Sequence, residues 1–130
     1  MIVLDASAAL DWILHTPVGL QVEARIYSGR ESVHVPHLLD LELTQILRRL
    51  VVAGKVPADR AKAALGVLTN ARLLRHPHYQ LLPRIWQLRN NITAYDAAYI
   101  ALAESLDASL LTRDRKLALA PGHTVKIELF

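Results

Sequence analysis

The sequence predicts one α/β domain over residues 1–130, in which helices cover both faces of a central, mainly parallel β-sheet. A chain of 130 residues has the length of one domain with one core. A hydrophobic fraction of 52% against 21% charged residues is typical of globular proteins and excludes a disordered chain. Short apolar runs alternate with segments of helical periodicity. This alternation indicates three layers, α/β/α, around a buried sheet.

The strands are predicted from short apolar runs that are flanked on either side by polar residues or by residues typical of turns. These runs are Ile2–Leu4, Val33–Val35, Leu73–Leu74, Leu110–Thr112 and Val125–Leu129. In such sheets ligands bind outside the carboxyl ends of the strands, so functional side chains are expected just after these runs.

Between the strands, apolar residues recur at helical spacing. Pro17 and Gly19 are expected to break a helix that opens at Ser7. The other predicted helices run from Leu20 to Tyr27, from Leu39 to Leu50, from Val56–Asp59 through Leu68, from Leu82 to Leu88 and from Ala94 to Leu106.

The composition excludes several classes of protein. The chain has no cysteine, which excludes disulfides, thiolate metal sites and a cysteine nucleophile. No apolar run approaches the ~18–20 residues that a membrane span needs. Met1 is followed by neither a basic region nor a cleavage site, so we expect no signal peptide and a cytoplasmic protein.

The net charge of +3 is unevenly distributed along the chain. No acidic residue lies between Asp59 and Asp96, where the cations are Arg60, Lys62, Arg72, Arg75, Arg84 and Arg89. A basic segment on an otherwise acidic chain indicates a polyanion partner, because phosphate contacts dominate nucleic-acid affinity. The alternative is a set of solvated helix faces.

Three carboxylates stand where a predicted strand ends or a predicted helix begins. Asp5 ends the first strand, and Asp114 follows the Leu110–Thr112 strand by two residues. Asp96 is the only charged residue from Ile92 to Ala103, in the most apolar predicted helix. A lone carboxylate in that setting is destabilising unless a cation meets it.

A fourth candidate, Glu42, lies in the helix that follows Pro36. At about 100° per residue it sits at the edge of the apolar face, near Leu38 and Ile46. Asp40 is a rival on the same helical wheel, and the wheel alone does not choose between them.

Each carboxylate also has a structural alternative, because Asp is a common helix cap. Asp5 and Asp114 each precede a predicted helix, and Thr93 with Asp96 fits a capping box. Several carboxylates at one sheet edge, however, repel each other and need a divalent cation to stay ionised. Oxygen ligands without cysteine favour Mg²⁺ or Mn²⁺ over Zn²⁺.

Four segments resemble, in order and in spacing, the motifs of PIN domains. Ile2–Ala8 is similar to the family's opening, a strand that ends in Asp with a Ser two residues later. Pro36 followed by Glu42 matches the second motif and selects Glu42 over Asp40. The third and fourth motifs resemble Thr93–Ala103 and Leu110–Asp114.

Within that family, the small size and the Thr-Ala-Tyr-Asp helix start resemble the VapC toxins of type II toxin–antitoxin systems. The resemblance implies the three-layer α/β/α fold and an endoribonuclease that acts by metal-assisted hydrolysis and leaves 5′-phosphate and 3′-hydroxyl ends. It also implies an RNA substrate, an antitoxin that silences the toxin, and a homodimer.

The resemblance assigns roles to individual residues. Asp5 and Asp96 would be the principal Mg²⁺ ligands, with Mn²⁺ as the alternative metal, and Glu42 and Asp114 would complete the acidic pocket. Two hydroxyls, those of Ser7 and Thr112, would orient a ligand or water. The phosphates on either side of the cut would be held by Arg72, Arg75, Arg84 and Arg89.

Other functions leave some of these residues unexplained. A ribonuclease that uses histidine and the RNA 2′-hydroxyl ignores the carboxylates. A phosphatase with an Asp nucleophile needs a second Asp two residues on, where this chain has Ser7. His76-Pro77-His78 offers too few ligands for a structural zinc. A degenerate PIN module that binds RNA or protein without catalysis is the alternative from another class, and the presence of all four acids disfavours it.

Overall fold

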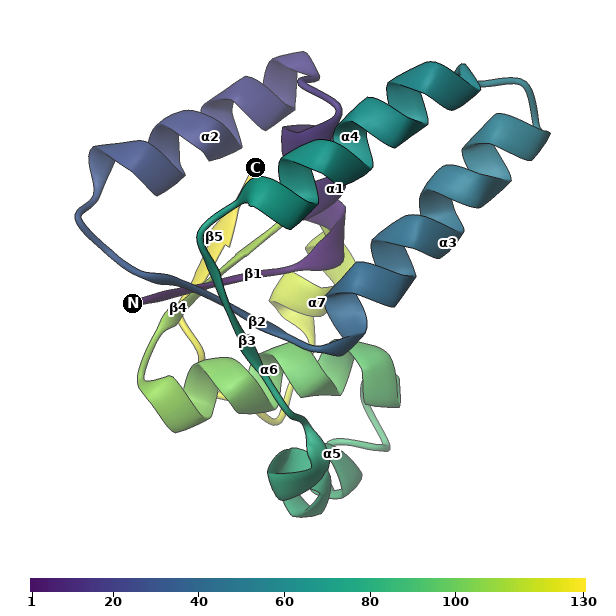
Figure 1. The fold of residues 1–130 in the computed structure, drawn as a ribbon. Coiled ribbons are helices and arrows are strands. Elements are labelled where there is room, and N and C mark those ends of the chain that lie inside the picture. The colour runs from purple at the N-terminus through teal and green to yellow at the C-terminus, as the bar shows by residue number, and fades with distance from the viewer.

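The computed structural model describes residues 1–130 and has one five-stranded parallel sheet (Figure 1). The strand order is β3-β2-β1-β4-β5, and every neighbouring pair is parallel. The strands are β1 (Ile2–Leu4), β2 (Val33–Pro36), β3 (Leu73–His76), β4 (Ser109–Thr112) and β5 (Ile127–Leu129). The predicted parallel α/β architecture is confirmed.

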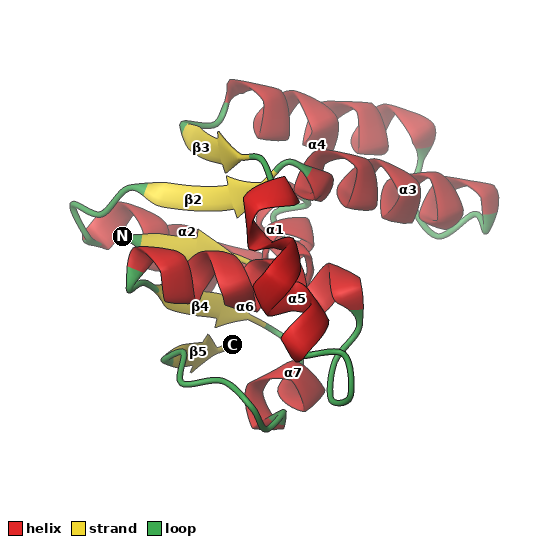
Figure 2. Ribbon diagram, turned by 90° about the horizontal axis from the view of Figure 1, so that it is seen from below, coloured by secondary structure: helices red, strands yellow, loops and turns green.

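Helices cover both faces of the sheet, as Figure 2 shows. They are α1 (Ala6–Ile13), α2 (Pro17–Ser28), α3 (Leu38–Val52), α4 (Ala58–Asn70), α5 (Leu82–Gln87), α6 (Ala94–Leu106) and α7 (Arg115–Leu119), with a 3₁₀ turn at Tyr79–Leu81. α6 packs on one face with α5 outside it, and α1, α2 and α4 lie on the other (Figures 1 and 2). No helix is both long and apolar enough to cross a membrane.

Burial explains why β1 and the middle of α6 are apolar. All three residues of β1 are inaccessible to solvent, because β1 is a central strand with helices on both sides. In α6 every residue from Ala97 to Ala103 is buried, between the sheet and α5. Asp96 is thus the last polar residue before a fully buried segment.

The prediction for Pro17 and Gly19 was half right. The chain does break between α1 and α2, where His15 has a φ of 52°, but Pro17 occupies the first turn of α2. Gly19 lies inside α2, and a Cβ there would come within 1.9 Å of the Asp11 carbonyl oxygen. Gly19 therefore permits a close approach of α1 and α2 and does not end a helix.

The sequence pattern predicts a strand only at Leu73–Leu74, but the structure extends that strand to His76. His76 is the last residue of β3, paired in register with Pro36 of β2. Leu73 packs into the core while Leu74 is exposed, as expected for a strand at the sheet edge. The cross-strand partner extends β3 beyond the apolar pair that the sequence pattern detects.

The strand order reverses between β1 and β4, which are neighbours in the sheet although far apart in sequence. The chain leaves β1 toward β2 on one side and leaves β4 toward β5 on the other. Such a reversal opens a crevice at the carboxyl ends of the two strands, where open parallel sheets bind their ligands. Asp5 and Asp114 follow these two strands.

Candidate active site

The carboxylate of Asp5 lies at the carboxyl end of β1 and is only 4% exposed. Its Oδ2 accepts hydrogen bonds from the Ser7 hydroxyl at 2.5 Å, the Thr112 hydroxyl at 2.8 Å and the Ser7 amide at 3.3 Å. All three protein donors bind this one oxygen. Asp5 therefore caps α1 with Oδ2, and Oδ1 remains for a ligand.

Thr112 connects the ends of β1 and β4. Its hydroxyl donates to Asp5 and accepts from the Asp114 amide at 3.0 Å. The Ser7 hydroxyl similarly donates to Asp5 and accepts from the Arg113 amide at 2.9 Å. The two hydroxyls thus position the Asp5 carboxylate relative to the loop that carries Asp114.

Asp114 is half-buried and is the N-cap of α7. Its Oδ1 accepts from the amides of Lys116 at 2.8 Å and Leu117 at 3.1 Å. The capping role expected for Asp114 is present, and it again uses a single carboxylate oxygen. Capping and ligand binding are therefore compatible at Asp114.

Asp96 lies in the first turn of α6, where the Thr93 hydroxyl accepts from its amide at 3.2 Å. The return bond of a capping box, from the Thr93 amide to the carboxylate, is not formed. Burial raises the pKa of Asp96, and the negative charges of Asp5 and Asp114 raise it further. The Asp96 carboxylate thus shares the electrostatic environment of both strand ends.

Glu42 joins this group from α3. Burial raises the pKa of Glu42, the charges of Asp5 and Asp96 add to the effect, and a hydrogen bond from the Tyr99 hydroxyl opposes it. Asp40 instead forms a two-bond ion pair with Arg75, at 2.8 and 3.1 Å. The structure therefore brings Glu42, and not Asp40, toward the other acids.

Tyr99 is a site residue that the sequence analysis missed. It lies one turn after Asp96 on α6, is fully buried, and burial raises the pKa of its hydroxyl. The signal was its i+3 spacing from Asp96, which places both side chains on the same side of a helix. Its partner on α3 is 57 positions away in sequence, which local spacing does not reveal.

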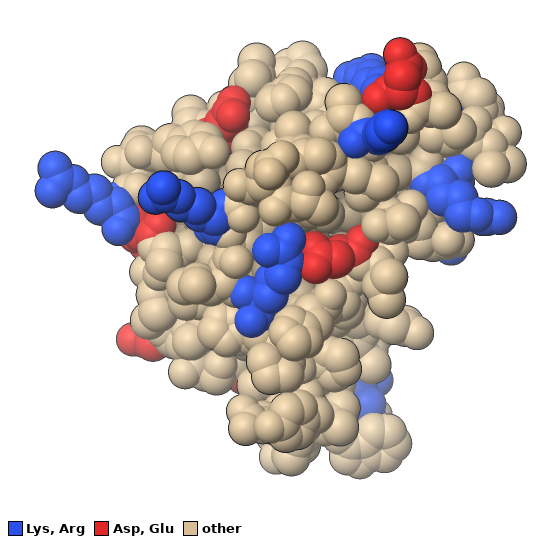
Figure 3. Space-filling view, in the orientation of Figure 1, with Lys and Arg blue, Asp and Glu red and all other residues tan.

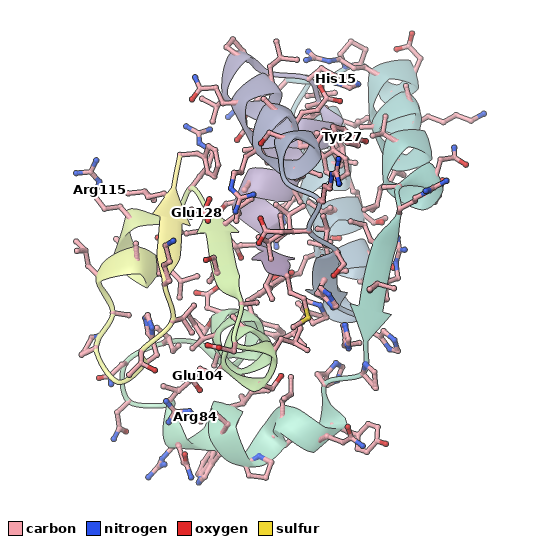
Figure 4. The ribbon with its side chains drawn as sticks, turned by 90° about the vertical axis from the view of Figure 1, so that its left-hand side faces the viewer. His15, Tyr27, Arg84, Glu104, Arg115 and Glu128 are labelled. Atoms are coloured by element: carbon pink, nitrogen blue, oxygen red, sulfur yellow. The ribbon has the colours of Figure 1, made fainter.

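The four predicted RNA-binding arginines differ in their surroundings. Arg75 is paired with Asp40, and Arg84 is paired with Glu104 through bonds of 2.7 and 2.9 Å. Figure 4 shows Arg84 beside Glu104 at the outer layer of the molecule. The remaining two, Arg72 and Arg89, are exposed and form no ion pair.

On the face seen in Figure 3, Lys and Arg side chains are dispersed and separated by neutral surface. They form no continuous basic patch there. A pocket of about 470 Å³ instead collects cations and acids together, lined by Arg89, Asn90, Asn91, Ile92, Thr93, Asp96, Asp114, Lys116 and Leu117. Two of the four acids, Asp96 and Asp114, thus line one pocket together with two cations, Arg89 and Lys116.

The donor set fits a hard divalent cation better than zinc. The four acids offer only oxygen atoms, and no group of three His, Asp or Glu side chains is already arranged around a common metal position. Mg²⁺ commonly binds through one or two carboxylates and keeps several waters, so Asp5 and Asp96 would be enough as direct ligands. Glu42 and Asp114 would then act through water.

The histidines do not form a competing metal centre. His34 Nδ1 and His76 Nε2 are 2.8 Å apart in stacked rings, and His34 Nε2 is 2.8 Å from the Ser32 hydroxyl. These contacts occupy both ring nitrogens of His34.

Comparison with known proteins identifies the family of the chain. Residues 2–122 match the PIN domain family. The chain belongs to the PIN-domain family. This PIN domain is 42% identical to Ribonuclease VapC1 of Mycobacterium tuberculosis over 131 residues, which cover 98% of this chain and 96% of that protein. It is 38% identical to Ribonuclease VapC12 of the same organism, covering 99% and 98% of the two chains.

Solved structures show the same fold. VapBC2 from Rickettsia felis, bound to a promoter DNA fragment, has a chain that matches this PIN domain with a TM-score of 0.72 at 15% identity, covering 99% of this chain and 98% of that one. PAE2754 from Pyrobaculum aerophilum matches with a TM-score of 0.69 at 28% identity, over 97% and 81% of the chains. The predicted family and the predicted fold are confirmed.

Proposed function

We propose that this PIN domain is a Mg²⁺-dependent endoribonuclease and the toxin of a toxin–antitoxin pair. The observation that carries the proposal is that the charges of Asp5 and Asp114 act on Asp96, and those of Asp5 and Asp96 act on Glu42, near the reversal of strand order. Burial and mutual repulsion raise the pKa values of Asp96 and Glu42, which is the electrostatic state that a bound cation relieves.

The names of the relatives support a ribonuclease. VapC1, VapC9 and VapC12 of Mycobacterium tuberculosis are each named ribonucleases and align with at least 91% of this chain. Identity of 38–42% over that length makes a shared reaction class the simplest inference.

The residues of this chain would divide the work of hydrolysis. Asp5 and Asp96 would hold the metal, and Ser7 and Thr112 would keep the Asp5 carboxylate in one orientation. A bound Mg²⁺ would supply the acidity that activates water at neutral pH and the charge that stabilises the leaving oxygen. Glu42, held by Tyr99, and Asp114, held by the α7 amides, would orient water around the reacting phosphate.

A protein partner and a second copy of the chain are part of the proposal. The fold neighbour from Rickettsia felis was solved as VapBC2, which supports an antitoxin partner for this chain. An apolar groove of about 310 Å³ between α3 and α4 offers surface for contact with the antitoxin or with a second copy of the chain. Its lining includes Leu47, Val51, Val52, Ala61 and Leu65. Gel filtration of the purified chain alone tests for the homodimer, and gel filtration with the antitoxin tests for the complex.

End-labelled RNA, incubated with and without EDTA, tests the reaction. We expect EDTA to stop cleavage, and Mg²⁺ or Mn²⁺ to restore it with 5′-phosphate and 3′-hydroxyl ends. We expect poor restoration by Ca²⁺, because it tolerates looser geometry and acidifies water less.

The same assay applies to the variant Asp96→Asn. Its matched control is Asp107→Asn, because Asp107 ends the same helix in a left-handed conformation that Asn also tolerates.

Two outcomes would contradict the proposal in different ways. Cleavage that persists in EDTA and leaves a 2′,3′-cyclic phosphate would indicate a histidine mechanism through the 2′-hydroxyl. A 2′-deoxy substitution at the cut blocks that route and spares the metal-dependent one. Failure to cut any RNA with metal present would instead favour a binding module.

A further inference from the structure

Trp86 is an exposed aromatic residue whose position the fold explains only in part. Ile85 and Leu88 of the α5 segment are buried against the core, which turns the intervening Trp86 outward, and its ring is 68% exposed. An indole in that position buries little area and adds little to stability.

The Arg89 guanidinium covers one side of this ring. Its central carbon lies 4.7 Å from the ring centroid, and Nη1 donates to the Trp86 carbonyl at 2.9 Å. No carboxylate pairs with Arg89, which lies just after α5, in contrast to Arg84 of α5, which pairs with Glu104. The positive charge of Arg89 therefore lies over the indole and is not offset by a carboxylate.

Arg89 also lines the pocket that contains the acids Asp96 and Asp114. The same pocket is lined by Lys116, a second cation without an ion pair, and by the exposed Asn90, whose amide forms no hydrogen bond within the protein. Arg89 thus contacts the Trp86 ring and also lines the pocket that holds Asp96 and Asp114. An RNA strand needs such cations, because its phosphates are repelled by the four carboxylates.

We propose that Trp86 and Arg89 form a subsite for one nucleotide of single-stranded RNA beside the scissile phosphate. The base stacks on the indole, and Arg89 with Lys116 binds the flanking phosphates. Aromatic side chains and Arg planes are the usual platforms for unpaired RNA bases. The subsite rests on the proposed ribonuclease function. It adds that the substrate has an unpaired base next to the cleaved phosphate.

Tryptophan fluorescence tests the stack without requiring turnover. Trp12, the other tryptophan, is 3% exposed, so quenching by a bound base reports on Trp86. A short single-stranded RNA is titrated, in metal-free buffer, into Asp96→Asn protein and into the same protein with Trp86→Ala, Trp86→Phe or Tyr27→Ala. Tyr27 is a matched control, since it is 71% exposed on α2, far from α5 (Figure 4).

We expect RNA to quench the Trp86 emission. Because the Trp86 variants lack this reporter, affinities are compared by the anisotropy of a labelled RNA, and Trp86→Ala should weaken binding about five- to tenfold, the lower end of the stacking effect. Trp86→Phe should retain most of the affinity, and Tyr27→Ala all of it. An abasic site at one register of the RNA should abolish quenching. Unchanged affinity in Trp86→Ala, or quenching by an acidic peptide and not by RNA, would overturn the subsite.

Cleavage assays with Mg²⁺ separate this proposal from the one on which it rests. If the wild-type chain cuts RNA and Trp86→Ala raises KM while kcat changes little, both proposals are supported. If Trp86→Ala leaves kcat/KM unchanged, the subsite is wrong and the ribonuclease function stands. If the wild-type chain cuts no RNA, the proposed function fails, and the subsite fails with it.

Discussion

The hydroxyl of Tyr99 on α6 donates a hydrogen bond to the carboxylate of Glu42 on α3. Because Asp96 lies one turn before Tyr99, this bond holds two acids of the site in a defined relation. Tyr99 itself is completely buried, so its orientation is set by the core. The acidic site is thereby connected to the packing of the helix that carries Asp96.

Replacing Tyr99 with Phe should lower activity without unfolding the protein. Glu42 loses its donor, so its pKa should rise and the acidic limb of the pH–rate profile should move to higher pH. Loss of an orienting partner typically costs about 10–100-fold in metal affinity or activity. We expect the free energy of unfolding, measured in urea, to fall by about 1 kcal/mol. Tyr27→Phe, which removes an exposed hydroxyl, is the control.

The substitutions Asp5→Asn and Asp96→Asn should each abolish cleavage. Asp96→Asn should also raise the melting temperature of the metal-free protein, because it removes a buried charge that Asp5 and Asp114 repel. Asp5→Asn should gain less, since Asp5 accepts three protein hydrogen bonds. Calorimetry with and without Mg²⁺ measures this, and the stabilisation by Mg²⁺ should vanish in both variants. Full activity in either variant would indicate that the carboxylate is only a cap, because Asn caps nearly as well as Asp.

The arginines should differ in their effect on the salt dependence of RNA binding. Arg89→Gln or Arg72→Gln should reduce the slope of log K against log salt by roughly one for each lost phosphate contact. Arg75→Gln and Arg84→Gln should change it less, because Asp40 and Glu104 already offset those charges. Filter binding of a cleavage-deficient variant at several salt concentrations gives the slopes. An unchanged slope in all four would show that these residues form only a solvated face.

Stability should decrease in mild acid because of His34. Burial lowers the pKa of His34, and the neighbouring His76 adds to the effect. The unfolded chain takes up a proton at this residue near pH 6.5, whereas the folded chain resists it, so stability is complete above that pH and falls below it. Urea unfolding between pH 7.5 and 5.5 should show a smaller decrease in His34→Gln than in the control His37→Gln, whose side chain is exposed. Equal decreases in the two variants would assign the acid sensitivity to other groups.

Much of the fold follows from the sequence by itself, because the signals are local. The apolar runs that become β1 and β4 are buried on both faces, and the bounds of α6 are those that its pattern predicts. Residues that directly follow these strands reach the same sheet edge in any parallel arrangement, so Asp5 and Asp114 were identifiable from position alone.

Only the tertiary structure decided how the side chains are partnered. By the helical wheel Asp40 and Glu42 are equivalent, and they differ because Arg75 reaches one and Tyr99 reaches the other. Gly19 resembles a helix breaker until the Asp11 carbonyl of α1 is placed against it. Helix and strand patterns depend on neighbours a few positions away in sequence. These side-chain pairings depend instead on which distant segments the core brings together, and burial strengthens the electrostatic interactions between them.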